Sequence, residues 1–311
     1  MTGKGGAIKP DPQPVPFPSQ AMSMRICILI PDDADLTRYD DWQDQAVVIE
    51  PLLAAHGLTV EWRAWTDTAP IEADLVLPLM AWGYHRALSR WRKQLDRWQG
   101  VRFLNPFEVL RWNTDKRYLL ELAQRGVAIV PTRFHERLDP AALDDARAAF
   151  GTADLVVKPP VSAGSDHTWL LRDDAPCPPE ALGEAMLVQP MMPSIASEGE
   201  YSLFWLAGEF AHAILKRPKS GDFRVQGQFG GQSQAVHPPA AARDLALATL
   251  EAIDAELLYA RIDMVGDGRG GYALMEIELI EPWLSLDRTQ DGGKAFAAAI
   301  AAAARQPASA G

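Results

Sequence analysis

Short apolar runs alternate with segments of helical period over residues 24–106. The apolar runs cover residues 25–30, 58–62 and 74–79. A continuous apolar run is typical of a strand that is buried on both faces of a parallel sheet. Between the runs, helical spacing predicts one helix over residues 43–56 and a second that carries Trp91, Leu95 and Trp98. This alternation predicts a small doubly wound α/β domain.

Two loops of this predicted domain are candidates for substrate binding. In an open parallel sheet, ligands bind beyond the carboxyl ends of the strands. Residues 31–42 and 80–86 follow the first and third predicted strands. We therefore expect side chains from these two loops to contact the substrate.

After residue 106 the pattern predicts a different class of fold. Helices are predicted over residues 106–124, 140–150 and 240–258. Strands are predicted over residues 127–130, 154–158, 169–171 and 187–191, and in the hairpins 201–206 with 210–215 and 261–265 with 274–282. Short turns join the hairpin strands, so pairing there is expected to be antiparallel. The whole chain is therefore expected to be α/β plus α+β.

Composition and charge narrow the class of protein. The 311 residues are enough for about two domains. A net charge of -11 argues against nucleic acid or an anionic membrane as the main partner.

No apolar run reaches the length of a membrane helix, and no apolar signal-peptide core follows the N-terminus. Cys27 and Cys177 are far apart, a pattern typical of a reducing compartment, so a cytoplasmic location is expected. Residues 1–23 are proline-rich and are expected to be disordered.

The hairpin near residue 270 carries three carboxylates. Glu276 and Glu278 share one face of a strand because side chains alternate, and Asp263 is expected opposite them on the partner strand. Carboxylates that converge in an apolar setting repel one another unless a cation neutralises them. Oxygen ligands without His or Cys select a hard cation, Mg²⁺ or Mn²⁺. The alternative interpretation is an acidic face exposed to solvent. The apolar flanking residues argue against it, because they indicate that the face is enclosed.

Lys158 ends a predicted strand and precedes a loop of small residues. The loop contains Ser162, Gly164 and Ser165, whose amides and hydroxyls could donate to a phosphate while the lysine supplies charge. The segment matches neither the Walker loop nor the dinucleotide-binding glycine pattern. Taken by itself, the better reading of Lys158 is a surface lysine whose stem lies along apolar surface.

A basic segment stands out in this acidic chain. It contains Lys216, Arg217, Lys219 and Arg224 and leads into Gly230 and Gly231. Such a segment indicates an anion-binding loop. An exposed charged turn is nearly as good an interpretation.

The order of these features resembles one family. The supporting motifs are Trp112-Asn-Thr-Asp-Lys116, Val156-Val-Lys-Pro159 with Ser162-Ala-Gly-Ser165, Gln189-Pro190 with Gly199-Glu200, Gly221-Asp-Phe-Arg224 with Gly230-Gly231, Arg261-Ile-Asp263, and Glu276-Ile-Glu278. Over roughly residues 105–290 the chain resembles the ATP-grasp superfamily, and most of all its glutathione-synthetase-like branch. Trp82-Gly-Tyr84 and residues 158–165 further resemble the O-ureido-serine cyclo-ligases, which close the ring of cycloserine.

The resemblance implies a particular domain organisation. An N-terminal doubly wound α/β domain would cover residues 24–107, after the tail of residues 1–23. A small α+β subdomain of the ATP-grasp fold would cover residues 108–190. A C-terminal antiparallel-sheet subdomain, residues 191–305, would carry the metal and nucleotide sites.

The resemblance also implies roles for individual residues. Lys116 and Lys158 would hold the phosphates of ATP, and Glu200 would bind the ribose, with Glu198 as the competing candidate. The residues that would read adenine are Gln189, Pro190, Met191 and Met192. The residues that would neutralise the transferring phosphoryl and the acyl phosphate are Lys216, Arg224 and Arg261. The residues that would bind two Mg²⁺ (or Mn²⁺) ions are Asp263, Glu276 and Glu278. The last departs from the asparagine of many members and adds negative charge.

The chemistry implied by the family is ATP-dependent ligation. ATP would phosphorylate a carboxylate to an acyl phosphate, which an amine then attacks, giving ADP and phosphate. The phosphoryl transfer needs positioning and charge neutralisation, with no protein nucleophile. The leading hypothesis is a carboxylate–amine ligase for a small amino-acid-like substrate. Alternatives are a cyclo-ligase of the cycloserine type, a kinase that stops at phosphorylation, and a nucleotide-binding module without ligase activity. A homo-oligomer is left open.

Overall fold

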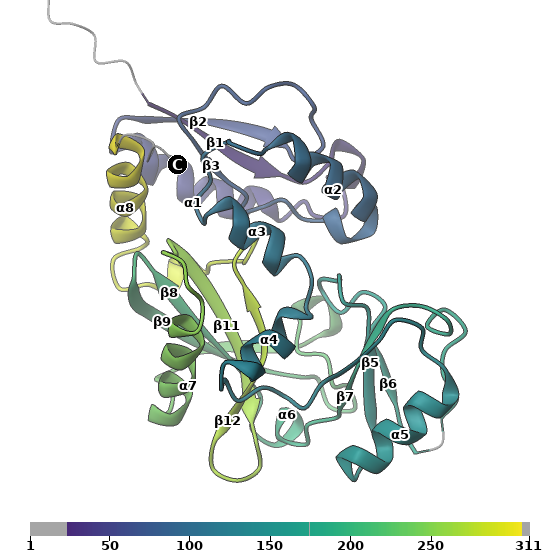
Figure 1. Cartoon of the computed structure of the whole chain (residues 1–311). Coiled ribbons are helices and arrows are strands. Elements are labelled where there is room, and N and C mark those ends of the chain that lie inside the picture. The colour runs from purple at the N-terminus through teal and green to yellow at the C-terminus, as the bar shows by residue number, and fades with distance from the viewer. Residues whose placement is uncertain (1–23, 174, 307–311) are drawn as a thin grey trace, which may run out of the picture.

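A computed structural model describes residues 24–173 and 175–306 of the chain, and the predicted proline-rich tail lies outside the described residues. Within them the strands form three sheets (Figure 1). One sheet is parallel and lies at the N-terminal end of the molecule, and the other two are antiparallel. None of the described helices has the length and apolar character needed to cross a membrane.

The first sheet confirms the predicted doubly wound pattern. Its strands are β1 (Met24–Ile30), β2 (Leu58–Ala64) and β3 (Leu75–Leu77), in the order β2-β1-β3. Helix α1 (Trp42–Ala54) packs beside α8 (Lys294–Arg305), so the alanine-rich C-terminal helix returns to the N-terminal sheet (Figure 1). The tryptophan stripe of α2 (Leu88–Arg97) belongs to the core on the other face. Helices on both faces explain why β1 is almost wholly apolar.

The second sheet is small and antiparallel. Its strands are β4 (Arg133–His135), β5 (Leu155–Lys158), β6 (Trp169–Leu171) and β7 (Met186–Pro190), in the order β4-β7-β5-β6. Helix α5 (Pro140–Phe150) packs on β7 and begins with Asp139, whose side chain accepts from the backbone N–H of Ala142. Lys158 is the last residue of β5, which is one of the two inner strands of this sheet.

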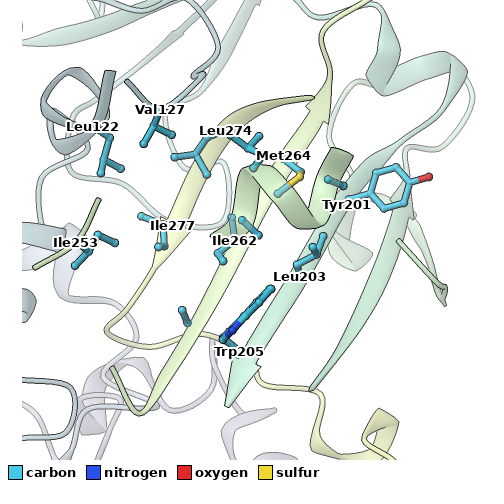
Figure 2. Close-up of a cluster of buried hydrophobic side chains, with 14 of the residues drawn as sticks. Leu122, Val127, Tyr201, Leu203, Trp205, Ile253, Ile262, Met264, Leu274 and Ile277 are labelled. Carbon is cyan, nitrogen blue, oxygen red and sulfur yellow. The ribbon is translucent and has the colours of Figure 1, made fainter. Parts of the chain in front are cut away.

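The third sheet is the largest. Its strands are β8 (Glu200–Leu206), β9 (Glu209–Arg217), β10 (Gln232–Ala235), β11 (Tyr259–Gly266) and β12 (Tyr272–Glu278), in the order β10-β9-β8-β11-β12. Helix α7 (Ala240–Glu251) packs against β12 and β8. Figure 2 shows the apolar face of this sheet, where Ile262, Met264 and Ile277 point into one buried cluster. The opposite face is therefore free to carry polar side chains.

Shorter helices connect these parts. They are α3 (Phe107–Asn113), α4 (Tyr118–Gln124), α6 (Ser194–Ser197) and the 3-10 helices Asp33–Asp35, Tyr84–Ala87, Gly227–Phe229 and Leu286–Arg288.

The single helix predicted over residues 106–124 is wrong, because the structure breaks it between α3 and α4. Side chains and backbone at the break bind distant segments instead of continuing the helix. The Asn113 amide donates to the carbonyl of Ile277 and accepts from the N–H of Leu279, both at 2.8 Å. The backbone N–H of Lys116 donates to the carbonyl of Pro160 at 2.8 Å. The break presents Lys116 to the loop after β5.

Two other predicted elements are also wrong in extent. Residues 127–130 form no strand and contribute a single bridge between Ile129 and Leu274, and the strand follows later as β4. The helix predicted to reach residue 258 ends at Glu251. In the first segment the backbone of Ala128 and Val130 bonds to Leu274 of β12, and after α7 the N–H groups of Ile253 and Ala255 form local turn bonds that end the helix.

Candidate active site

The register of the β11–β12 hairpin confirms the predicted carboxylate face. Asp263 pairs with Glu276, and Arg261 pairs with Glu278. A register shift follows Asp263, before Met264. Since neighbouring residues alternate between faces, these four side chains lie opposite the apolar residues of Figure 2. The hairpin thus brings three acids and one base together.

Asp263 is neutralised by two basic side chains. It is 4% exposed, and the Arg261 guanidinium donates to it at 2.8 Å. Lys216 Nζ lies 3.6 Å away, and the Ser202 hydroxyl donates to the same carboxylate. Burial alone would raise the pKa of Asp263, but Arg261 and Lys216 hold it at about 2. Asp263 is therefore ionised at neutral pH.

Lys116 and Lys158 lie on the second-sheet side of this face. Lys116 Nζ lies 2.9 Å from Glu276 Oε1 and donates to the backbone carbonyl of Ser162 in the small-residue loop. Lys158 is 8% exposed, so the interpretation of a surface lysine is wrong. Burial lowers the pKa of Lys158 to about 8, and Lys116 adds to the effect while Glu276 opposes it. A further anion beside these lysines would relieve their mutual repulsion.

Negative charge on the hairpin face is not fully compensated. Glu278 pairs with Arg261, yet burial, reinforced by repulsion from Glu276 and Asp263, raises its pKa to about 7. The oxygen atoms of Asp263, Glu276 and Glu278 are the ligand type that a hard divalent cation prefers, and such a cation would remove the repulsion among the three carboxylates. Across residues 24–173 and 175–306, however, no group of three or more acidic, His or Cys side chains is already arranged around a common metal position. The basic partners occupy the carboxylates instead.

The residues predicted to read adenine lie along β7 and just beyond it. The Gln189 side chain is buried and donates to the Thr132 hydroxyl at 2.8 Å. After Pro190, the backbone N–H of Met191 donates to the carbonyl of Asp154 at 2.9 Å. Met191 and Met192 pack on an apolar cluster that includes Val265 of β11. This stretch thus connects the second sheet to the third.

Glu200 and Glu198 have different surroundings. Glu200 begins β8, is buried, and accepts from Lys216 at 3.0 Å. Glu198 lies before the strand and accepts from the Tyr272 hydroxyl at 2.7 Å. Glu200 therefore shares its lysine with Asp263 on the carboxylate face, whereas Glu198 is tied to the far end of the hairpin.

The basic segment does not act as one cluster. Lys216 belongs to β9 and points to Glu200 and Asp263. Arg224 instead pairs with Asp222 at 2.8 Å and lies 3.7 Å from the centre of the Phe229 ring. The structure thus brings Lys216, but not Arg224, onto the carboxylate face. The loop after β9 also reaches the small-residue loop, where Gln228 donates to the carbonyl of Gly164 at 3.4 Å.

The small-residue loop, residues 159–168, is held by the N-terminal domain. Arg86 pairs with Asp166 at 2.8 Å, and His85 Nε2 lies 3.4 Å from the same carboxylate. Gly164 and Ser165 both have positive φ, as tight turns require. The predicted substrate loop near Trp82 therefore lies directly against the predicted phosphate loop.

A narrow pocket lies where these parts meet. Its polar lining consists of Tyr84, Asn113, Lys116, Ser162, Glu276, Glu278 and Glu281. Sequence reasoning did not single out Glu281. The sequence offers only a weak signal for it, an acid between the apolar pair Leu279-Ile280 and Pro282. The pocket joins the carboxylate face of the hairpin to the N-terminal domain.

Comparison with known proteins agrees with this arrangement. Residues 26–105 match the family described as the D-cycloserine synthetase DcsG, N-terminal domain. The cycloserine biosynthesis protein DcsG of Streptomyces lavendulae is 31% identical over 277 residues, which cover 81% of this chain and 92% of that protein.

Solved structures also show similarity to DcsG. The crystal structure of D-cycloserine synthetase DcsG has a TM-score of 0.78 and 27% identity, and the match covers 90% of this chain and all of that one (100%). Two further structures share the fold. D-alanyl-alanine synthetase A from Vibrio cholerae has a TM-score of 0.66 and 15% identity, and the match covers 91% of this chain and 98% of that one. The ATP-grasp ligase PsnB has a TM-score of 0.60 and 15% identity, and the match covers 90% of this chain and 99% of that one. The chain therefore belongs to the DcsG family of ATP-grasp enzymes and is an ATP-dependent ligase that forms C–N bonds.

Proposed function

We propose that the chain is an intramolecular ligase of the cycloserine-forming type. ATP would activate the carboxylate of a small amino acid as an acyl phosphate, and a nitrogen atom of the same molecule would attack it. The observation that carries the proposal is the match of residues 26–105 to the DcsG N-terminal domain, because this domain supplies Tyr84 to the pocket that Lys116 and Glu276 also line. The substrate side of the site is thus the part that resembles the cyclo-ligase.

The phosphates of ATP fit between Lys116 and Lys158. Both lysines are buried beside the small-residue loop, whose Ser162, Gly164 and Ser165 offer backbone N–H and hydroxyl donors. Two buried cations near one another favour an anionic ligand, as the lowered pKa of Lys158 indicates. Adenine would lie against the stretch beyond β7, which consists of Gln189, Pro190, Met191 and Met192. Glu200 is the better candidate than Glu198 for the ribose, since it lies on the carboxylate face.

Charge neutralisation during transfer is assigned to three bases. Lys216 and Arg261 are already on the carboxylate face, within reach of Asp263. Arg224 is paired with Asp222 and would have to exchange that partner for a phosphoryl oxygen. Fixed positive charge around a transferring phosphoryl group stabilises its transition state without solvent reorganisation.

The carboxylates Asp263, Glu276 and Glu278 would hold Mg²⁺ (or Mn²⁺), as two ions. The hairpin register supports this, because it sets the three carboxylates on one face, where burial and then repulsion from Glu276 and Asp263 raise the pKa of Glu278. When bound, the ions would orient the phosphates and withdraw charge from them. The chain itself contributes the hairpin register that fixes the three oxygen donors, and the loop of residues 159–168 that excludes water from the activated acid.

The discriminating experiment is ADP release with O-ureido-serine, with and without an added amine. An intramolecular ligase turns over with this single substrate, and an added amine changes the rate little. Glu276→Gln should lower turnover at least about a hundredfold, since it removes one of the three oxygen donors assigned to the metal ions. Glu251→Gln, at the exposed end of α7, is the matched control and should turn over normally.

Other outcomes point to the alternatives. Turnover that requires an added amine identifies an intermolecular carboxylate–amine ligase. ADP release without any ring-closed product identifies a kinase. Nucleotide binding without ADP release, whichever acid is supplied, identifies a binding module. Normal turnover by Glu276→Gln would remove this residue from the metal assignment.

A further inference from the structure

Glu281 differs from every other carboxylate in the pocket by having no basic partner. Glu276 pairs with Lys116, and Glu278 pairs with Arg261. In the part of the chain that the structure describes, Glu281 forms no ion pair, although its side chain lines the same pocket. The pocket therefore contains one carboxyl group that no ion pair within the described residues neutralises.

The position of Glu281 is fixed from both sides. It follows Leu279 and Ile280, which are fully buried. Its backbone carbonyl accepts from Trp82 Nε1 at 2.9 Å. The Trp82 ring stacks on Trp283, with ring centres 6.0 Å apart and an interplanar angle of 21°. These contacts fix the backbone at Glu281, from which the side chain reaches the pocket.

The hydroxyl of Tyr84 hydrogen-bonds to the Glu281 side chain. Tyr84 comes from the N-terminal domain, and its ring is buried against Trp91. The pair thus joins the N-terminal domain to the end of β12. Together the two side chains present oxygen atoms, and no positive charge, to the pocket.

An unmatched carboxylate in a pocket favours a cationic ligand group. Burial and repulsion from Glu278 raise the pKa of Glu281 to about 8, against the attraction of Lys116, so the empty pocket holds this group largely protonated at neutral pH and a cationic ligand would displace its proton. A ligand that brings a positive charge with hydrogen-bond donors recovers the cost of desolvating this group. Primary ammonium groups meet both requirements, since they offer three donors.

We propose that Glu281 and Tyr84 bind the ammonium group of an α-amino acid substrate. The proposal rests on the proposed function, because it takes the substrate carboxylate to be activated beside Lys116 and Glu276. In an α-amino acid the ammonium and carboxylate groups are attached to the same carbon. A site for the ammonium must therefore share one small pocket with the phosphate-binding lysine, as Glu281 does.

The pairing has a chemical consequence for ring closure. An ammonium nitrogen that is held protonated by a carboxylate has no free lone pair, so it cannot attack an acyl phosphate. Another nitrogen of the substrate is then left as the nucleophile. Within one substrate molecule, attack by the α-nitrogen would also close a strained three-membered ring, so Glu281 would serve to orient the substrate and select α-amino acids, and to keep the α-nitrogen from attacking the acyl phosphate of a second molecule.

The test pairs two substrates with two variants. The substrates are O-ureido-serine, as either enantiomer, and its analogue with hydrogen in place of the amino group. For Glu281→Gln, we expect KM for the amino compound to rise roughly 10- to 100-fold, because a charge-assisted contact is lost. KM for the analogue should stay within about twofold, since that compound brings no charge to the pocket. Tyr84→Phe should shift KM in the same selective way by roughly threefold to tenfold. Glu251→Gln is the control.

A variant that weakens both substrates equally would overturn the proposal, since it would indicate a structural role. No effect on either substrate would also overturn it. If the wild-type protein releases no ADP, calorimetry in the presence of a non-hydrolysable ATP analogue compares serine with glycerate, which differ only in amino against hydroxyl. A preference for serine that Glu281→Gln abolishes supports the ammonium site even where the cyclo-ligase proposal fails. Absence of that preference, or its persistence in Glu281→Gln, overturns the ammonium site by itself.

Discussion

Two sets of carboxylates lie within one site and are treated differently by the fold. On the β11–β12 hairpin, Asp263, Glu276 and Glu278 each meet a lysine or an arginine. Just beyond the end of β12, Glu281 accepts from a hydroxyl group and, within the described part of the chain, forms no ion pair. The difference separates charges that the protein balances for itself from a charge that it leaves for a ligand. It also implies opposite consequences for stability.

The largest expected effect comes from unbalancing the hairpin. Arg261→Met leaves the half-buried Glu278 with no partner and leaves the buried Asp263 with Lys216 as its basic partner. Breaking a buried ion pair from one side costs about 3–5 kcal/mol, because the remaining charge stays desolvated. We expect the free energy of unfolding to fall by that amount in urea denaturation at pH 7.

An exposed pair supplies the matched control for this variant. Arg111 and Asp96 lie 3.4 Å apart with side chains 42% and 67% exposed. Arg111→Met should therefore cost less than about 1 kcal/mol. Equal losses in the two variants would mean that the hairpin carboxylates need no partner, and the contrast with Glu281 would disappear.

The hairpin was predictable because its information is local. Alternation of side chains sets Glu276 and Glu278 on one face, and the glycine-rich turn brings Asp263 opposite. The apolar runs of the N-terminal domain were predictable for a similar reason, since residues 26–30 of β1 are buried on both faces of the sheet and are all apolar. The roles of Lys116 and Lys158 came from motif order, and only their burial and partners come from the structure.

A smaller effect is expected from the pH dependence of Glu281. Its pKa is about 8 in the folded protein and has an ordinary value of 4.5. Between these values the folded protein holds more protons than the unfolded chain, so the free energy of unfolding falls as pH rises from 4.5 to 8. Below and above this window the group contributes no slope. Because the side chain is partly exposed, we expect a decline of about 1–2 kcal/mol, which Glu281→Gln removes.

The comparison of the two pH curves isolates Glu281 from other buried groups. Burial lowers the pKa of His85 and of His212 to about 4, so these residues make the protein more stable as pH rises from 4 to 6.5, in the opposite direction. Both histidines are present in the variant and cancel in the difference. Denaturation curves that run parallel from pH 5 to pH 8 would mean that Glu281 ionises alike in the folded and unfolded chains.

The parts that sequence could not supply depend on contacts between distant segments. The break between α3 and α4 is stabilised by Asn113 bonding to β12 and its extension, more than 160 residues away. No local pattern encodes that contact, since residues 106–124 have good helical spacing. Glu281 resembles any acid before a proline until Tyr84 and Trp82 are placed beside it. The detachment of Arg224 likewise follows from Asp222 and Phe229, which compete locally for its guanidinium.

The smallest expected effect concerns the loop of residues 159–168, which lies against the N-terminal domain beside the pocket. At neutral pH His85 is uncharged, because its pKa is about 4, so Arg86 supplies the ion pair to Asp166. Asp166→Asn should lower the free energy of unfolding by less than about 1 kcal/mol, as for other partly exposed pairs. Its effect on KM for ATP should be about twofold to fivefold, because the loop of residues 159–168 then closes over the phosphates less often. Steady-state kinetics with Asp96→Asn as control measures this difference. An unchanged KM would mean that the loop is held by the contacts of Lys116 and Gln228 alone, and that the N-terminal domain shapes the pocket only through Tyr84 and Trp82.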